Sequence, residues 1–522
     1  MLDLLLVFTT IILIIWLIKS SSHPKHYPPG PRLPLPIIGD AYMIGSDFAS
    51  GFCSMIKKYG KVIGLWLGPD RVVIISDFDI LQEILNKNET SGRQMTKASG
   101  TTYILSFKKI ISHLLMFYIK GVYRRGWSLD GTPGVIFSSG ITWFELRKSS
   151  LQILKDFGVG KNILEDIIEE EVDNLIQHID DNWINVPLDV SNFFNIAVLA
   201  SLWRIISGET LKIGDPKLEF LISKVDNIVT ETSSVFGAIS MVSVPLFKFM
   251  NMVGLLNVVK SANELFEYCT KILKIHRDKF IDGDNPLTFI EALLHKIDLI
   301  DDPSHPLYGN TGELNLLNTL LDLFIAGSDT TSNTLNWAML FMIQNPDDQV
   351  KVREELLKNI GFKKAKMSER NLTPYTEAVL HEISRRGNIA PMALFHQTNE
   401  PITFDQFKIP SKTVIVPMIG EIMHDSNHFP CPNNFDPGRY LTKNEDGNVI
   451  FKPNPRVVPF GIGKRRCLGE VIARTSMYKF FTAIIQKYSI VSGQDEIILD
   501  QQNGGIICGP KPYKLKFMKI EN

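Results

Sequence analysis

One segment of the sequence, residues 311–345, has the pattern of a single α-helix of unusual length. It reads TGELNLLNTLLDLFIAGSDTTSNTLNWAMLFMIQN, and Asn345 followed by Pro346 marks its end and the start of the next helix. Over thirty helical residues span roughly 45–50 Å at about 1.5 Å per residue. Because this length exceeds the radius of a typical domain, we expect the helix to cross the middle of the folded body.

The centre of this helix has a composition that a protein core alone does not explain. It consists of small and polar residues: Ala326, Gly327, Ser328, Asp329, Thr330 and Thr331. Small residues leave room beside the helix, and polar residues occupy positions that should be the driest in the molecule. A core helix that tolerates one glycine is the simpler alternative, but the whole cluster favours a non-protein group packed against the helix.

Most of the remaining chain has helical periodicity, and only a few β-branched runs predict strands. RVVIIS at residues 71–76 and KTVIVP at 412–417 are the clearest of these runs. The chain has 522 residues, 44% of them hydrophobic, so we expect a large, mainly α body with a small β region. The net charge of −1 argues against nucleic acid as a partner. The acidic stretch at residues 165–173 is expected to be a solvated helix face.

The first residues differ from the rest because residues 4–18 carry no charge. A helix over residues 1–18 would be about 27 Å long, which suits a thin bilayer such as that of the endoplasmic reticulum. A cleaved signal peptide is the alternative, but Asp3 stands where such a peptide is basic. Lys19 and Lys25 follow the apolar run and keep the body cytosolic. We predict a membrane anchor over residues 1–19, a stiff proline-rich hinge over 20–39 and the main domain over 40–522.

A second apolar segment, residues 236–259, carries a single charge at Lys248 and is interrupted by Pro245. A second membrane span and a helix–loop–helix that dips into the membrane surface both fit this pattern. The interruption favours the dipping helix–loop–helix.

The stretch PFGIGKRRCLGE at residues 459–470 places Cys467 among glycines and positive charges. The five cysteines form no CxxC pair, which argues against a disulfide framework and indicates a reducing compartment. Glycines and the start of the following helix bring amide N–H groups to the sulfur and favour a thiolate. The guanidinium of Arg465 can donate two parallel hydrogen bonds to a carboxylate. This combination favours an iron porphyrin held by Cys467 over a nucleophilic cysteine, for which none of the eleven histidines is close in sequence.

Phe460, Gly463, Arg465, Cys467 and Gly469 fit the pattern F-x-x-G-x-R-x-C-x-G. With the proline hinge and the long helix in the same order, the whole chain resembles a microsomal cytochrome P450. The resemblance implies the fold of that family, with its long central helix over the haem. It also implies haem b with Cys467 as the axial thiolate and metal ligand, and Phe460, Gly463, Arg465 and Gly469 around the cofactor.

Further motifs match the same family. Glu382 and Arg385 match E-x-x-R and, with PGRY at residues 437–440, imply a buried ion network behind the haem. Tyr440 stands there in place of the usual phenylalanine. Trp143 and Arg147 match W-x-x-x-R. These two residues and His396 are implied partners of the haem propionates.

The centre of the long helix matches A-G-x-D/E-T-T/S. The resemblance implies that Ala326 and Gly327 lie against the haem, where Gly327 leaves space for oxygen. It implies two catalytic residues: Thr330 hydrogen-bonds the iron-bound peroxo group, and Asp329 relays protons for cleavage of the O–O bond. The thiolate of Cys467 favours the same cleavage by donating electron density.

No flavin domain accompanies these motifs, so a separate NADPH-dependent flavoprotein reductase is implied, with cytochrome b5 as a further candidate partner. Four basic residues could form the docking patch: Arg147, Lys148, Lys155 and Lys464. The catalytic domain is expected on the cytosolic face of the endoplasmic reticulum, in contact with membrane lipid.

The predicted function is a monooxygenase acting on a lipophilic small molecule: a sterol, terpenoid, fatty acid or xenobiotic. The alternatives are a haem-thiolate isomerase or dehydratase of hydroperoxides, and a catalytically silent haem or ligand carrier. Expected pocket residues are Phe324, Ile325, Ala326, Met392, Ala393, Leu394, Ile506 and Ile507. The region of residues 94–125 is longer than the resemblance predicts. It is either a genuine insertion or an artefact of the gene model.

Overall fold

The computed structural model describes residues 24–31, 34–35, 39–44, 48–68, 70–93, 134–156, 162–233, 258–279, 286–495 and 507–520. The predicted anchor (1–19), the unexplained stretch (94–125), most of the second apolar segment (236–257) and Ile506 lie outside these residues. Within the described ranges, no helix combines the length and the apolar character that a membrane span requires.

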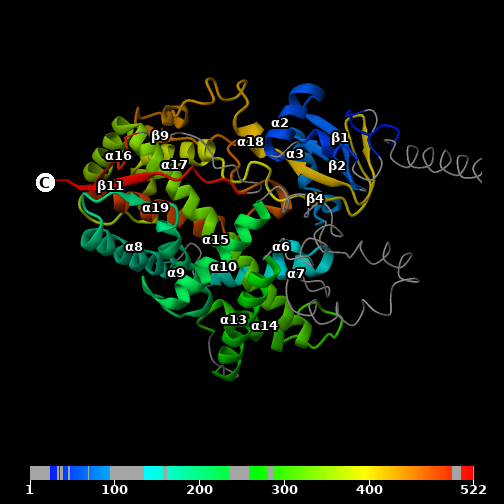
Figure 1. Ribbon diagram of the computed structural model, residues 1–522, viewed down its shortest axis with the longest axis horizontal. Coiled ribbons are helices and arrows are strands. Elements are labelled where there is room, and N and C mark those ends of the chain that lie inside the picture. The colour runs from blue at the N-terminus through cyan, green and yellow to red at the C-terminus, as the bar shows by residue number, and fades with distance from the viewer. Residues whose placement is uncertain are drawn as a thin grey trace, which may run out of the picture.

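The long helix predicted from the sequence is present as α15 (Gly309–Gln344), 36 residues long. It begins two residues before the expected start and ends where Asn345 donates its side-chain amide to the carbonyl of Phe341 at 2.8 Å. Pro346 then opens α16 (Pro346–Asn359). α15 runs through the centre of the helical part of the molecule, as Figure 1 shows, and packs against α6, α9, α17 and α19.

Shorter helices surround α15. They are α2 (Phe48–Tyr59), α3 (Phe78–Leu85), α6 (Gly134–Phe137), α7 (Gly140–Asp156), α8 (Asn162–Asn182), α9 (Phe193–Ser207), α10 (Pro216–Ser233), α13 (Val258–Lys279), α14 (Phe289–Asp298), α17 (Pro374–Gly387), α18 (Ile419–Met423) and α19 (Glu470–Lys487). Short 3₁₀ helices include η5 (Pro437–Tyr440) and η6 (Gly463–Arg465).

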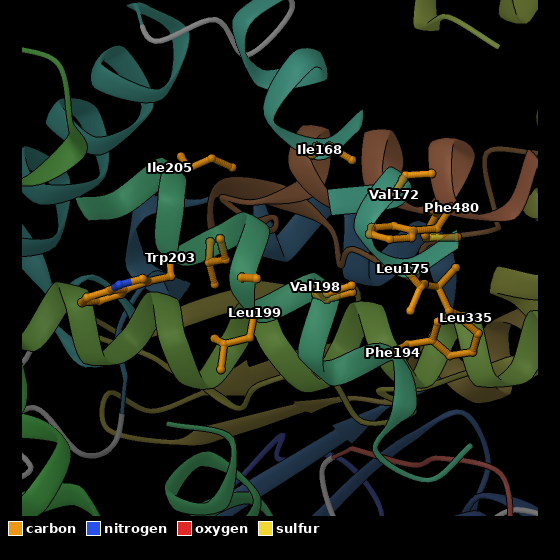
Figure 2. Close-up of a cluster of buried hydrophobic side chains, with 14 of the residues drawn as sticks. Ile168, Val172, Leu175, Phe194, Val198, Leu199, Trp203, Ile205, Leu335 and Phe480 are labelled. Carbon is orange, nitrogen blue, oxygen red and sulfur yellow. The ribbon is translucent and has the colours of Figure 1, made fainter. Parts of the chain in front are cut away.

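In the main hydrophobic core α9 packs against α8 and α15, and α19 packs against the same two helices (Figure 2). Thirteen of the fifteen residues of α9 are buried, because the helix is apolar almost all round and must be covered on every side. Phe194 of α9 lies near Leu335 of α15 in this cluster. α9 therefore fixes the position of the central helix.

Both predicted strands are present, in a four-stranded sheet of order β1-β2-β7-β4. β1 (Val62–Leu67) pairs antiparallel with β2 (Asp70–Ile75), and β2 pairs parallel with β7 (Val414–Pro417). β4 (His396–Gln397) closes the sheet. The smaller sheets are made by β10 (Tyr488–Ser492), β11 (Lys514–Lys519) and β3 (Leu188–Asp189), by β5 (Ile402–Phe404) with β6 (Phe407–Ile409), and by β8 (Leu441–Lys443) with β9 (Val449–Phe451). The mainly α class with a small β region is confirmed.

Part of the predicted hinge, residues 27–30, lies against the sheet. The amide of Gly64 in β1 donates to the carbonyl of Pro29 at 2.9 Å, and the Tyr27 hydroxyl donates to the carbonyl of Val72 in β2 at 3.0 Å. The buried ring of Tyr27 adds apolar contact. This strap, residues 27–30, is therefore joined to the main domain.

The acidic stretch at residues 165–173 on α8 is not a simple solvated face, and that expectation was wrong. Lys479 of α19, whose side chain is 2% exposed, makes ion pairs with Glu165 at 3.3 Å and Glu169 at 2.5 Å. Glu171 is itself buried. Charge spacing alone did not reveal this, since the partner lies 310 residues away from Glu169.

Candidate haem site

The cysteine loop is held in a tight conformation between β9 and α19. The Cys467 amide donates to the carbonyl of Phe460 at 2.9 Å, and α19 begins three residues later at Glu470. Gly463 has φ +75°, and a Cβ on it would lie 2.2 Å from the carbonyl oxygen of Leu85 in α3. Only glycine fits there. Gly469 has an ordinary φ and open space beside it, so no contact of the protein itself requires a glycine at that position.

The side chain of Cys467 is accessible, but the protein alone does not favour its thiolate. Desolvation raises the pKa of the Cys467 thiol above its ordinary value and Glu470 adds to this, although the Gly469 amide, Arg147 and Arg466 act in the opposite direction. The glycines and the helix start in the motif predict instead a lowered pKa of this thiol. A metal ion bound at the sulfur would supply the missing positive charge, since a coordinating thiol is deprotonated.

Arg465 lies in a cage of backbone carbonyls. Its Nε donates to Ser91 at 2.8 Å, and its terminal nitrogens reach the carbonyls of Ile136 at 3.3 Å and of Ser138. The guanidinium lies 4.1 Å from the ring centroid of buried Trp143. Burial, with Arg93 and Arg147 nearby, lowers the pKa of Arg465 to about 7. Because arginine stays charged in proteins, this shift indicates a positive charge that the protein compensates poorly.

Arg93 and His396 extend this cationic cluster. Arg93 is 7% exposed and donates to the carbonyls of Leu394 at 3.0 Å and Phe395 at 2.6 Å. Burial and the charge of Arg147 lower its pKa to about 9. Arg93 could not be assigned a role from its spacing in the sequence, because its partners lie some 300 residues away.

His396 is buried, and its pKa lies well below the ordinary value because of that burial and of Arg93. Its Nδ1 lies 3.0 Å from the carbonyl of Thr90, which can only accept, so the neutral ring keeps its proton there. Nε2 is then an acceptor. His396 could donate to a propionate only after taking up a second proton.

Trp143 and Arg147 both reach the cysteine loop from α7, as their i,i+4 spacing predicts. Arg147 donates to the carbonyl of Arg466 at 2.6 Å, and burial lowers its pKa. Three clustered guanidiniums beside an accessible sulfur fit a cofactor that carries both a metal ion and carboxylates. Haem has this chemistry, and the residues present fit it.

The middle of α15 presents an accessible stretch. Ala326 is exposed and Thr330 is half-buried, although most of this helix is buried. The Thr330 hydroxyl donates to the carbonyl of Ala326 at 2.7 Å. Of the other expected pocket residues, Ile325, Ala393, Leu394 and Ile507 are half-buried.

Two expected pocket residues belong to the core instead. Phe324 is fully buried and stacks on Trp203 of α9, with ring centroids 4.8 Å apart. Met392 is 1% exposed and packs in the core beneath the four-stranded sheet. Both are large apolar side chains whose neighbours in the sequence are expected pocket residues. Packing against other elements has turned these two side chains into the core.

Gly327 faces α9. A Cβ on Gly327 would lie 2.6 Å from Cδ2 of Leu202, so the end of the Leu202 side chain would have to shift to admit it. The direction of the missing side chain is therefore set by helix packing, whereas the motif relates this glycine to space for oxygen.

Asp329 is also turned towards α9. Its carboxyl is 5% exposed and accepts a hydrogen bond from Nδ2 of Asn195 at 3.1 Å. Burial and the nearby Asp226 of α10 raise the pKa of Asp329 to about 7, while the bond from Asn195 acts to lower it. The group can thus exchange a proton near neutral pH.

The short helix α6 connects α15 to the cysteine loop. The buried carboxylate of Asp322 on α15 accepts from the amide of Ile136 at 2.7 Å, and the carbonyl of Ile136 lies 3.3 Å from Arg465. Asp322 was not predicted as a site residue, although it lies only one turn before the small and polar cluster at residues 326–331.

The ion network predicted from E-x-x-R is present and joins α17 to η5. Glu382 and Arg385 are fully buried and joined by two hydrogen bonds of 2.7 and 2.8 Å. Arg385 also donates to the carbonyls of Met423 and Pro432, and Arg439 lies 3.6 Å from Glu382. The Tyr440 hydroxyl donates to Glu382 at 2.7 Å.

Known proteins with similar sequences are all described as cytochromes P450. The family model described as Cytochrome P450 matches residues 28–115 and 117–517. Cytochrome P450 2B19 of Mus musculus is 32% identical over 99% of this chain and 98% of its own length. Cytochrome P450 2B12 of Rattus norvegicus is 31% identical over 99% of both chains. Cytochrome P450 2H2 of Gallus gallus is 29% identical over 96% of this chain and 95% of its own. This chain belongs to the cytochrome P450 family and is of the microsomal type.

Proposed function

We propose that this monooxygenase acts on a lipophilic small molecule and receives its electrons from a separate NADPH-dependent flavoprotein reductase. The observation that carries the proposal is the accessible stretch of α15 at Ala326 and Thr330, which would border the reaction space. Haem, which family members bind through a cysteine thiolate, supplies the activation of dioxygen when it is bound.

Each residue of the cysteine side has a proposed role in holding the haem. Cys467 ligates the iron, and Arg93, Arg147 and Arg465 neutralise its carboxylates. Trp143 supports the Arg465 guanidinium by stacking, since its ring centroid lies 4.1 Å away. Phe460, Gly463 and Gly469 shape the loop around the sulfur. His396 contributes to the same cluster.

On the opposite side, Thr330 and Asp329 are the proposed catalytic residues. The hydroxyl of Thr330 is half-buried and bonded to its own helix, and rotation about its Cα–Cβ bond would turn it to the reaction space. The Asp329 carboxyl, with a pKa of about 7, can both take up and release a proton. Ala326 keeps that accessible stretch of α15 free of a bulky side chain, whereas Gly327 lies on the side that faces α9.

The substrate proposed for this site is apolar. Ile325, Ala326 and Leu394 offer aliphatic surface that would suit a sterol, a terpenoid, a fatty acid or a xenobiotic. The hydroperoxide isomerase and the silent carrier are not favoured. A proton relay of the kind proposed for Asp329 serves oxygen activation and has no use in either of them.

We also propose that the anchor over residues 1–19 and the hinge over 20–39 hold the domain to membrane lipid on the cytosolic face of the endoplasmic reticulum. Lys148 and Lys155 are exposed on α7, and Lys464 is exposed on the cysteine loop. With Arg147, they form the proposed docking patch for the reductase and, as a further candidate, for cytochrome b5.

The proposal is tested by reconstituting the full-length protein with a microsomal reductase, NADPH and ¹⁸O₂ over a panel of lipophilic compounds. We expect one labelled oxygen atom in a product. Asp329→Asn and Thr330→Ala should divert NADPH consumption into hydrogen peroxide while the protein still binds haem. Product formation without NADPH, or equal coupling in both variants and the parent, would reject the proposal.

A further inference from the structure

Asn195 is an unusual residue for its position on α9. The helix is apolar almost all round, and a buried amide in such surroundings destabilises the fold unless its polar atoms are paired. The buried serines of α9 satisfy their hydroxyls within their own helix, since Ser201 donates to Ala197 and Ser207 donates to Trp203. Asn195 instead reaches across to α15.

The partner of Asn195 is the carboxyl of Asp329. Nδ2 of Asn195 lies 3.1 Å from Oδ1 of Asp329, and the two residues are only 6% and 5% exposed. α9 and α15 run side by side here (Figure 2), with Val198 and Leu199 packed one turn further along. Tight packing leaves the amide and the carboxyl little freedom to separate.

We propose that Asn195 is a positioning residue for oxygen activation, which holds the Asp329 carboxyl against α9 and keeps it able to ionise. This inference rests on the proposed function of Asp329 as the proton relay. Asn195 touches neither the substrate nor the haem in this account and acts through Asp329.

The electrostatic surroundings of Asp329 give Asn195 this influence. Burial is the largest cause that disfavours the ionised carboxyl, and the half-buried Asp226 of α10 adds repulsion. Asp322, two turns earlier on α15, has its carboxylate directed to the amide of Ile136 on α6. Against these, the amide hydrogen of Asn195 stabilises the ionised form.

Removing the amide donor has a defined direction. Without it the ionised carboxyl loses a stabilising bond, so the pKa of Asp329 rises, by about one unit for a hydrogen bond to a charged group. At neutral pH the carboxyl then stays protonated. Because it no longer releases its proton readily, it cannot pass on one proton after another. More NADPH should be lost to hydrogen peroxide, and the pH at which coupling changes should move upward.

The test uses Asn195→Leu, which keeps the size of the side chain and removes the donor, with Asn195→Ala as a second variant. Infrared titration of the Asp329 carboxyl band in the resting enzyme, assigned by its loss in Asp329→Asn, reads the pKa without turnover. We expect both variants to shift the titration upward by about one pH unit. Peroxide released per NADPH should rise several-fold. Ser201→Ala, which removes a buried hydroxyl of the same helix, should leave both readings unchanged.

A double-mutant cycle decides whether Asn195 acts through Asp329. In the Asp329→Asn background, Asn195→Leu should add nothing to peroxide release. An unshifted titration in Asn195→Leu and Asn195→Ala, or an equal increase of peroxide in both backgrounds, would overturn the inference. Failure of the proposed function has a different signature, because Asp329→Asn would then leave coupling unchanged.

Discussion

Glu382 is a fully buried carboxylate, and several donors converge on it. Arg385 contributes two hydrogen bonds, the amide of Asp436 donates at 3.0 Å, and the Tyr440 hydroxyl donates at 2.7 Å. A buried charge is tolerated only when it is paired and its oxygens are satisfied. Tyr440, which stands in place of the family's usual phenylalanine, thus gives this chain an additional donor.

We predict that Tyr440→Phe lowers the free energy of unfolding by about 1–2 kcal/mol, because an acceptor on a buried charge loses its donor. Urea unfolding followed by tryptophan fluorescence measures the change. Tyr42→Phe is the matched control, since Tyr42 is 55% exposed. Equal stability of Tyr440→Phe and the parent would show that the hydroxyl contributes nothing.

Asp329 predicts a pH dependence of stability. Its pKa is raised to about 7 in the folded protein, so between roughly pH 4 and pH 7 the folded state binds more protons than the unfolded state. The free energy of unfolding therefore falls as the pH rises through this window. Asp329→Asn removes the effect and should be more stable than the parent by roughly 1–3 kcal/mol at pH 8, but not at pH 4. Urea unfolding at the two pH values tests this, and a pH-independent difference would contradict it.

Single residues with a characteristic spacing could be predicted from the sequence, but their contacts could not. The spacing around Cys467 identified the loop, and E-x-x-R identified a network that is present. The guanidinium of Arg465 donates its hydrogen bonds to backbone carbonyls, which the spacing did not predict. Neither Arg93 nor Asn195 was predicted to have a role. Their partners lie 134 to 302 residues away, where only the folded chain brings them together.

At the scale of elements, the fit between α9 and α15 determines the position of the relay. Leu202 of α9 lies against Gly327 of α15, and Trp203 stacks on Phe324 one turn of helix away. The same pair of helices carries Asn195 and Asp329. Helix packing and the proposed proton relay are therefore coupled.

Gly327→Ala brings a methyl group against Cδ2 of Leu202, which must shift, so the protein should gain less than the about 1 kcal/mol that helix propensity alone offers. Leu202→Ala opens the contact, so the double variant should be more stable than the sum of the two single effects implies. Urea unfolding of the four proteins gives the coupling energy. Strict additivity would show that the two side chains do not meet.

Elements with strong local signals were predictable, whereas their pairings were not. The length of α15 and the strands at 71–76 and 412–417 follow from periodicity and β-branched residues. The parallel pairing of β2 with β7 joins segments more than 300 residues apart, and no turn sets its register. The orientations of Phe324 and Met392 depended on neighbours of this kind.

At the scale of the whole molecule, the chain before the main domain has two parts that we expect to behave differently. Residues 1–19 are the predicted anchor, whereas the strap at residues 27–30 is hydrogen-bonded to β1 and β2. The strap covers one edge of the sheet and so belongs to the folded body.

A chain lacking residues 1–19 should keep its stability and move from the membrane fraction to the soluble fraction. A chain lacking residues 1–39 should also leave the membrane but lose stability, because the contacts of Tyr27 and Pro29 are removed. Fractionation and urea unfolding of both proteins measure these effects. Equal stability of the two shortened chains would contradict the role of the strap.

The central claim is that the sulfur of Cys467 binds the haem iron as a thiolate. The carbon monoxide difference spectrum of the reduced, full-length protein tests this claim most directly, because the position of the Soret band depends on the ligand opposite carbon monoxide. We predict a thiolate-type Soret band for the parent protein and its loss in Cys467→Ser, even where that variant retains haem. A thiolate-type band that persists in Cys467→Ser would contradict the account.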